Sequence, residues 1–231
     1  MPSTEITLLS SMATKPLLVA LTDAYRQRSG TAVRLESAGG VDAAKRVQAG
    51  EVFDVVVLAG DALATLAEQG HVRAPQAMAD SRIAIAVREG SPRRDIGSED
   101  ALRNTLLAAK TIGYSTGPSG RALLQIFDRW GLGETLGARL VQARPGVPVG
   151  GLVAAGEAEI GFQQLTELQG IAGIKLLGGL PPQLDIVTTF TGAVGAHSAQ
   201  PGAAQALLDF LASADTASIK LAHGMSPSAS S

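Results

Sequence analysis

Short apolar runs alternate along the chain with amphipathic stretches, and glycines or small polar residues separate them. The runs at 5–9, 32–35 and 53–58 predict strands, and the valine-rich third run is typical of a parallel strand covered by helices on both faces. The intervening stretches predict helices that end at Gly30, Gly50 and Gly70. Strands and helices that alternate through short turns predict an α/β lobe with a mainly parallel sheet.

The same alternation resumes in the second half of the chain. Strands are expected at 81–87, 111–114, 139–141 and 160–162, and helices at 99–108, 120–130 and 149–155. The segment LGGLPPQLD, residues 177–185, is expected to be a loop because of its paired glycines and prolines. The run 186–196 is interpreted as a strand that returns to the first lobe, followed by helices at 202–212 and 216–223 and a frayed tail, MSPSASS.

These elements predict an α/β protein of two lobes, each a mainly parallel sheet flanked by helices. Lobe I comprises residues 1–80 and 192–231, and lobe II comprises residues 81–191. Two hinge crossovers join the lobes, and a ligand is expected in the cleft between them, where the carboxyl ends of parallel strands lie.

Composition narrows the possible functions. A length of 231 residues with 45% hydrophobic residues allows a sizeable core, and a net charge of -2 without a basic run argues against a nucleic-acid partner. The absence of cysteine excludes disulfides and thiolate zinc sites. The longest apolar runs are far shorter than the roughly 20 residues that span a bilayer, so no membrane insertion is expected.

The N-terminus has no basic residue followed by an apolar block, and Glu5 stands where such a block would begin. We therefore expect a periplasmic protein if a signal peptide has been removed, and a cytoplasmic one if the chain is complete as given. The protein is expected to be a monomer.

Several predicted strands run into small or hydroxyl residues and then into a helix. A helix N-terminus presents unpaired N–H groups and partial positive charge, so such turns can bind an anion, although each could equally be an ordinary cap. The candidate ligand-binding residues in these turns are Ser10, Ser11, Met12, Gly39, Gly40, Ser115, Thr116, Gly117, Ser119 and Gly120.

Polar residues near these turns extend the candidate site. Arg121 and Arg144 could each pair with a carboxylate, or could simply be solvated. Gln163 and Gln164 follow a buried strand and could bond either a ligand or the neighbouring backbone.

Other chemistry has weaker support. The three histidines, at positions 71, 197 and 223, lack metal-ligand spacing, so no metal site is expected. The sequence around Ser119 lacks the last glycine of a nucleophile elbow and the lysine of a P-loop, and no full dinucleotide fingerprint follows a strand. No cofactor is expected, and no catalytic residue is identified.

The segments LLSSMATKPLLVAL, VQAGEVFDVVVLAG, SRIAIAV and AAGEAEIGFQQL occur in the order typical of type II periplasmic binding proteins. The chain resembles this family, close to the molybdate-binding proteins of ABC transporters. The resemblance implies that Ser11, the turn 115–120 and the helix start near Val147 coordinate an anion. Two departures put molybdate in doubt: Gly39 or Gly40 replaces the second coordinating serine, and Gln164 replaces a tyrosine.

The segments YSTGPSGRALLQIFDRWGL and GFQQLTEL with LPPQLDIVTTF are similar to a divergent branch that includes aconitate isomerase. This likeness implies a di- or tricarboxylate ligand. An allylic proton shift would need a general base, which the sequence does not identify.

Three functions therefore stay open. The first is the binding of a small oxyanion or carboxylate for delivery to the permease of an ABC transporter, and it is preferred. The second is a cofactor-independent isomerase of small unsaturated carboxylates, and the third is an anion sensor, which the lack of a DNA-binding segment disfavours.

Overall fold

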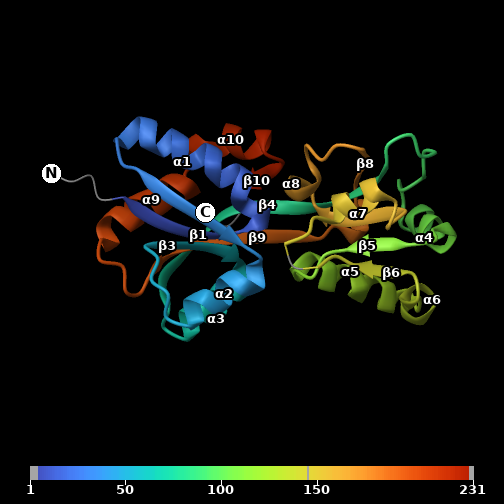
Figure 1. Ribbon diagram of the computed structural model, residues 1–231, viewed down its shortest axis with the longest axis horizontal. Coiled ribbons are helices and arrows are strands. Elements are labelled where there is room, and N and C mark those ends of the chain that lie inside the picture. Colours follow the sequence, from blue (N-terminus) through green and yellow to red (C-terminus); the bar gives the residue numbers. More distant parts are fainter. Residues whose placement is uncertain (1–4, 145, 229–231) are drawn as a thin grey trace. The chain divides into compact units, whose positions relative to one another are not determined.

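The computed structural model describes residues 5–144 and 146–228, and the chain divides into two compact units. Unit 1 comprises Met1–Ser81 and Thr188–Ser231, and unit 2 comprises Arg82–Val187. The chain passes from unit 1 to unit 2 within β4 (Val72–Arg88) and returns at the start of β9 (Val187–Gly195) (Figure 1). The return lies at residue 188, where the sequence prediction placed it at 192. The mixed α/β fold confirms the predicted fold class.

The sheet of unit 1 has the strand order β2-β1-β3-β9-β4, and β10 pairs with β4. Its other strands are β1 (Ile6–Ser11), β2 (Val33–Ala38), β3 (Val55–Ala59) and β10 (Met225–Pro227). β1 is parallel to β2 and β3, whereas β9 is antiparallel to β3 and β10 is antiparallel to β4. The carboxyl ends of β1, β2 and β3 therefore share one edge, which the turns into the helices follow.

Helices cover both faces of this sheet (Figure 1). Leu8 and Val57 point into a core shared with α1 and α9, whereas Leu9 and Val56 point into a core shared with α2 and α3, as the period of a strand requires. The helices are α1 (Lys15–Ser29), α2 (Gly40–Gln48), α3 (Gly60–Glu68), α9 (Pro201–Ala212) and α10 (Ala217–Ala222), with 3-10 turns at Met12–Thr14 and Ala214–Thr216.

Asp54, just before β3, forms hydrogen bonds with β1 and with the segment that follows β9. Its carboxylate accepts hydrogen bonds from the Thr7 backbone N–H (2.9 Å) and hydroxyl (3.0 Å), from Ser198 Oγ (2.6 Å) and from Gln200 Nε2 (2.9 Å). Burial acts to raise the pKa of this carboxyl, but the hydrogen bonds together outweigh burial, and the pKa lies below its ordinary value. Asp54 is thus held in its charged form as part of the fold.

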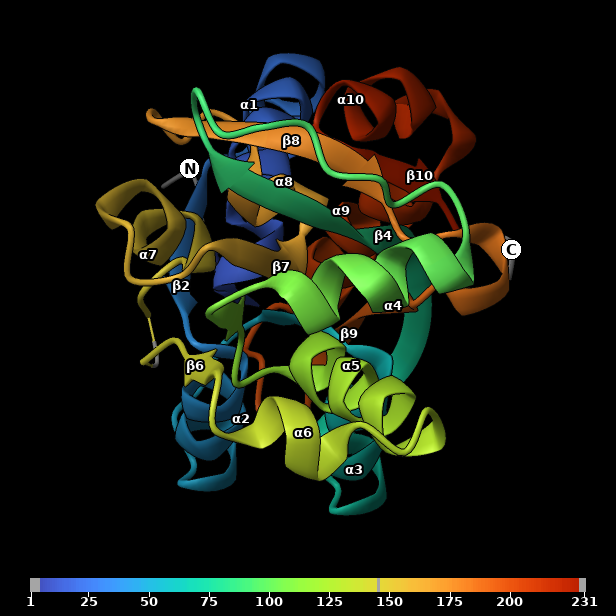
Figure 2. The same cartoon turned by 90° about the vertical axis from the view of Figure 1, so that its right-hand side faces the viewer.

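The sheet of unit 2 has the order β8-β4-β7-β5-β6. It adds β5 (Ile112–Tyr114), β6 (Leu140–Gln142), β7 (Ile160–Gln164) and β8 (Ile174–Gly179). β5 is parallel to β6 and β7, and β4 is antiparallel to β7 and β8 (Figure 2). The carboxyl ends of β5 and β7 therefore lie at one edge of this unit.

α7 packs closely on the sheet of unit 2. Gly161 lies under α7, where a Cβ atom would come within 2.6 Å of Val153 Cγ2 and 2.8 Å of Val149 Cγ1. Only glycine lets α7 pack this closely on β7. The helices are α4 (Glu99–Ala108), α5 (Pro118–Arg129), α6 (Gly133–Gly137), α7 (Val149–Ala155) and α8 (Leu165–Leu168), with a 3-10 turn at Pro182–Leu184.

Two predictions of irregular structure are wrong. Leu177, Gly178 and Gly179, expected in a loop, form the end of β8, because a register shift opposite Ile85 and Ala86 accommodates the extra residue. Residues 225–227, expected in a frayed tail, form β10 and pair with residues 79–81 of β4. None of the helices among the described residues is long and apolar enough to cross a membrane.

Candidate functional site

The carboxyl edge of unit 1 brings hydroxyl groups from two strands together. β1 and β2 pair in register, so Ser10 lies opposite Ser37, and their hydroxyl oxygens are 2.8 Å apart. Ser10 is fully buried and donates its hydroxyl to the Ser11 carbonyl (3.2 Å), so Ser37 is the donor between the two hydroxyls. Sequence reasoning missed Ser37, which the parallel pairing of these two strands could have indicated.

The start of α2 lies beside the end of β1. A Cβ atom on Gly40 would lie 3.8 Å from Ser11 Cβ, and Gly39 caps α2 without a side-chain hydrogen bond. Ser11 Oγ is 3.4 Å from Thr14 Oγ1, and Met12 begins the intervening 3-10 turn. The structure thus brings Ser10, Ser11, Met12, Gly39 and Gly40 to one edge, where the first N–H groups of α2 can bind an anion.

In unit 2, the turn from β5 into α5 forms a compact group of donors. Ser115 Oγ and Ser119 Oγ are 3.1 Å apart, and Gly117 caps α5 without a side-chain bond. A Cβ atom on Gly120 would lie 1.9 Å from the Ser115 carbonyl oxygen, so the turn closes only with glycine at this position. Thr116 is exposed in the same turn, as is Arg121 on the first turn of α5.

The loop before α7 lies next to this turn. The Ala143 backbone N–H donates to the Tyr114 carbonyl (2.9 Å), which fixes the loop at the carboxyl end of β5. Arg144 is exposed in this loop, and the Val147 N–H donates to its carbonyl (2.9 Å). Arg144 and Val147 therefore lie at the same edge of unit 2 as the turn 115–120.

The end of β7 meets the start of α7 through a buried amide. Gln163 Oε1 accepts a hydrogen bond from the Val149 backbone N–H (2.7 Å), and Gln163 is 3% exposed. Because residues alternate along a strand, Gln164, also buried, faces the opposite side of the sheet. The sequence left open whether Gln163 bonds a ligand or the neighbouring backbone. In the structure its side-chain oxygen bonds the backbone.

Glu167, in α8, is an ionisable group that sequence reasoning missed. Burial raises the pKa of its carboxyl to about 7, although a hydrogen bond from the Gln163 side chain acts in the opposite direction. A carboxyl that titrates near neutral pH can accept or donate a proton in a reaction. Its place four residues after Gln163, just beyond the end of a strand, is the only signal that the sequence carried.

Among the described residues, no group of three histidine or acidic side chains is placed to hold a metal ion. The edge of unit 1 has hydroxyls and backbone N–H groups, and the edge of unit 2 adds amides, two arginines and the carboxyl of Glu167.

Comparison with known proteins agrees with this architecture. The periplasmic molybdate-binding protein of Azotobacter vinelandii has a TM-score of 0.80 at 19% identity, covering 95% of this chain and 98% of its own. The sulfate-binding protein SubI from Mycobacterium tuberculosis H37Rv has a TM-score of 0.78 at 19% identity, covering 98% of this chain and 88% of its own. At these identities the likeness establishes the fold.

A relative found by its sequence has a higher identity than these two structures. Aconitate isomerase from Pseudomonas sp is 37% identical over 234 residues, which cover 98% of this chain and 89% of that protein. Residues 6–226 match the family described as bacterial extracellular solute-binding protein, which confirms the resemblance noted in the sequence. The chain belongs to the bacterial extracellular solute-binding protein family.

Proposed function

We propose that this protein binds a small carboxylate anion through the hydroxyl and backbone N–H groups of its helix-opening turns. The turn 115–120 carries this proposal: the Ser119 N–H is the first of α5, because Pro118 has none, and it has no side-chain acceptor at the glycine cap, while the Ser115 and Ser119 hydroxyls lie in the same turn. The start of α2 in unit 1 also has a glycine cap, with Asp42 in its first turn. Such groups stabilise a negative charge without a metal or a bound cofactor.

Three observations favour a carboxylate over a tetrahedral oxyanion. By the resemblance, Gly39 or Gly40 stands where the molybdate-binding pattern has a serine, and Gln164 stands where it has a tyrosine. Arg121 and Arg144 lie at the edge of unit 2 that carries the turn 115–120, and a guanidinium matches a carboxylate in a two-bond geometry. The relative that is 37% identical is named for a reaction of a carboxylate.

The same relative favours a second function, the isomerisation of an unsaturated tricarboxylate such as aconitate. In an allylic shift, a base removes a proton from the methylene carbon, and the electrons of the broken C–H bond form a new double bond. The electrons of the old double bond then take up a proton at the far carbon, so the formula is unchanged and no oxidant or reductant is needed. Glu167 is the described carboxyl whose pKa suits such a proton transfer.

Membership of a solute-binding family also suggests where this protein acts and which protein it binds. We expect an exported form of this chain to act outside the cytoplasm and to deliver its anion to the permease of an ABC transporter. Size-exclusion chromatography with light scattering tests the expected monomer.

Ligand screening tests the proposed binding. The unfolding temperature is measured with molybdate, tungstate, sulfate, citrate, cis-aconitate and trans-aconitate. A ligand at 100 times its dissociation constant adds about 2.7 kcal/mol of stability. Stabilisation by the carboxylates but not by molybdate, tungstate or sulfate is expected, and the reverse order would refute the carboxylate assignment. The ultraviolet absorbance of the aconitates then tests for isomerisation.

A double variant tests the turn itself. Ser115→Ala with Ser119→Ala removes both hydroxyls of the turn and is expected to weaken carboxylate binding at least tenfold without unfolding the protein. Thr135→Ala, which removes an exposed hydroxyl of α6, is the matched control. Unchanged affinity in the double variant would remove this turn from the site.

A further inference from the structure

Lys220, in α10, is a buried cation without a counter-ion in the described part of the chain. Its side chain is 0% exposed, and its ammonium has no hydrogen-bond partner among the described residues. Burial lowers its pKa to about 8, so the group is still mostly charged at neutral pH. An unpaired buried charge is costly, and buried charges in proteins are generally paired.

The carboxylates on the elements packed around α10 are engaged elsewhere. Those at the surface form ion pairs with arginines or accept from an amide, and the one in β4 accepts from a threonine hydroxyl. The pairs are Asp23 with Arg26, Asp215 with Arg28, Asp209 with Gln205, and Asp80 with Thr189. The described residues of unit 1 therefore leave the charge on Lys220 unbalanced.

A second buried polar group, the hydroxyl of Ser81, lies in the layer between the sheet of unit 1 and the helices α1 and α10. Ser81 Oγ is buried and has no hydrogen-bond partner among the described residues. Thr191 faces α3, because a Cβ atom on Gly60 of α3 would contact Thr191 Oγ1 at 3.3 Å. Thr189, two residues earlier in β9, faces the same side and donates its hydroxyl to Asp80 (2.7 Å). By alternation Ser81 faces the other side, where α1 and α10 pack.

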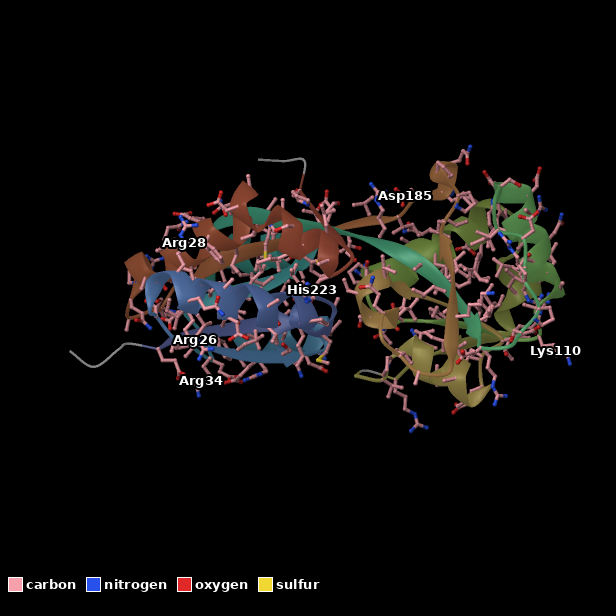
Figure 3. All side chains as sticks on the ribbon, turned by 90° about the horizontal axis from the view of Figure 1, so that it is seen from above. Arg26, Arg28, Arg34, Lys110, Asp185 and His223 are labelled. Atoms are coloured by element: carbon pink, nitrogen blue, oxygen red, sulfur yellow. The ribbon has the colours of Figure 1, made fainter. Side chains whose placement is uncertain are left out.

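This layer reaches the carboxyl edge of unit 1. Pairing across the sheet places Ser10 opposite Val57, Ala59 opposite Phe190, and Ser81 opposite Met225. Lys220 lies near the end of α10, and Met225 begins β10 after a short turn. In Figure 3, His223 at the end of α10 lies at the opposite end of unit 1 from Arg34, which is near the start of β2.

We propose that Lys220 is a counter-ion for a carboxylate of the bound anion, with the Ser81 hydroxyl as a second donor. The inference rests on the proposed binding of a carboxylate and names a residue that the turns do not include. The Ser81 hydroxyl lies at the carboxyl edge of this sheet, because its neighbour Asp80 accepts a hydrogen bond from Thr189, which is adjacent to the residue that pairs with the last residue of β3. A charge-assisted hydrogen bond there would be stronger than those from neutral turn donors.

Binding of cis-aconitate, trans-aconitate and citrate to the full chain is measured by calorimetry for the wild type and two variants. Lys220→Met removes the charge and keeps the length, and Lys220→Gln keeps a polar head without charge. Both variants are expected to lose at least tenfold in affinity for the carboxylate that binds the wild type best. Lys175→Met, at an exposed position of β8, is the control with the same change in net charge and is expected to bind as the wild type does.

The outcomes separate the two claims. If the wild type binds none of the carboxylates, the proposed function and this inference both fail. If the wild type binds and either folded Lys220 variant binds equally well, the inference alone is overturned. Circular dichroism confirms folding of each variant, and the second variant decides the question if the first does not fold.

Discussion

Variants of Lys220 measure the stability cost of a buried charge that has no counter-ion among the described residues. Burial lowers the pKa of its ammonium from the ordinary 10.5 to about 8. At about 1.4 kcal/mol for each pH unit, the difference corresponds to about 3 kcal/mol of lost stability when the group is charged in the folded state. Lys220→Met removes the charge and leaves a side chain of similar length among apolar neighbours, so the variant is expected to be more stable at pH 7 by about 2–3 kcal/mol.

The pH dependence identifies the cause. Because the folded-state pKa is lower than the unfolded one, the unfolded chain binds more protons between about pH 8 and 10.5. The stability of the wild type therefore rises with pH across this window, whereas below pH 8 the full penalty applies. Urea unfolding without ligand, at several values from pH 7 to 10, should show the advantage of Lys220→Met shrinking to less than about 1 kcal/mol at pH 10.

A matched exposed lysine separates this effect from general charge effects. Lys175→Met removes the same charge from the surface of β8 and is expected to change stability by less than about 0.5 kcal/mol at every pH. A Lys220→Met variant that is less stable than the wild type at pH 7, or an advantage that does not change with pH, would refute the reasoning.

Three further predictions concern Gly120 in the turn 115–120 and the carboxyls of Glu167 and Asp54. Gly120→Ala forces a Cβ atom against the Ser115 carbonyl and should destabilise the fold by about 2–4 kcal/mol in urea unfolding, whereas Gly137→Ala, with open space around it, should not destabilise it. Because burial raises the pKa of Glu167 to about 7, wild-type stability should fall by about 1–3 kcal/mol as the pH rises from 4.5 to above 7, and Glu167→Gln should abolish this dependence in thermal unfolding. Asp54→Asn should cost about 2–4 kcal/mol at pH 7 in urea, and the wild type should lose this contribution as the pH falls below the ordinary carboxyl pKa of 3.8; equal stability of the two proteins at pH 7 would argue against the Asp54 network.

The elements that carry a strong local signal could be predicted from the sequence. The valine-rich run that forms β3 is buried on both faces, so its apolar pattern is continuous. Gly30 ends α1 with a φ of 75°, a left-handed conformation that favours glycine. In such segments the local preference and the packing agree, and the predicted boundaries lie within a few residues of the observed ones.

Elements that depend on distant partners could not be predicted. The first half of β4 contains Pro75 and an Ala74 with a φ of 48°, so its pattern is not that of a regular strand. Residues 225–227 form β10 only because the edge of β4 is available at residues 79–81. These short segments gain their hydrogen bonds from tertiary pairing, which periodicity does not report.

The candidate site shows the same division. The turn 115–120 is a local motif, and sequence reasoning found it. Ser37 becomes notable only through its register with Ser10, and Lys220 reads as an ordinary surface residue of a helix until its burial is known. Glu167 likewise looks like a solvated residue in sequence, and its raised pKa follows from packing against β7 and α7.

The proposed carboxylate ligand and the cost of burying Lys220 are connected. Serine hydroxyls and backbone N–H groups are neutral dipoles, which suffice for an anion of spread, modest charge. A di- or tricarboxylate brings additional full charges, and neutral dipoles alone leave them unbalanced once water is excluded. Lys220 has a full positive charge inside unit 1, and a carboxylate that pairs with it, as we propose, would offset part of the cost of burying that charge. The stability gained by Lys220→Met and the affinity that it loses are therefore linked: a ligand that does not contact Lys220 would leave the first effect intact and abolish the second.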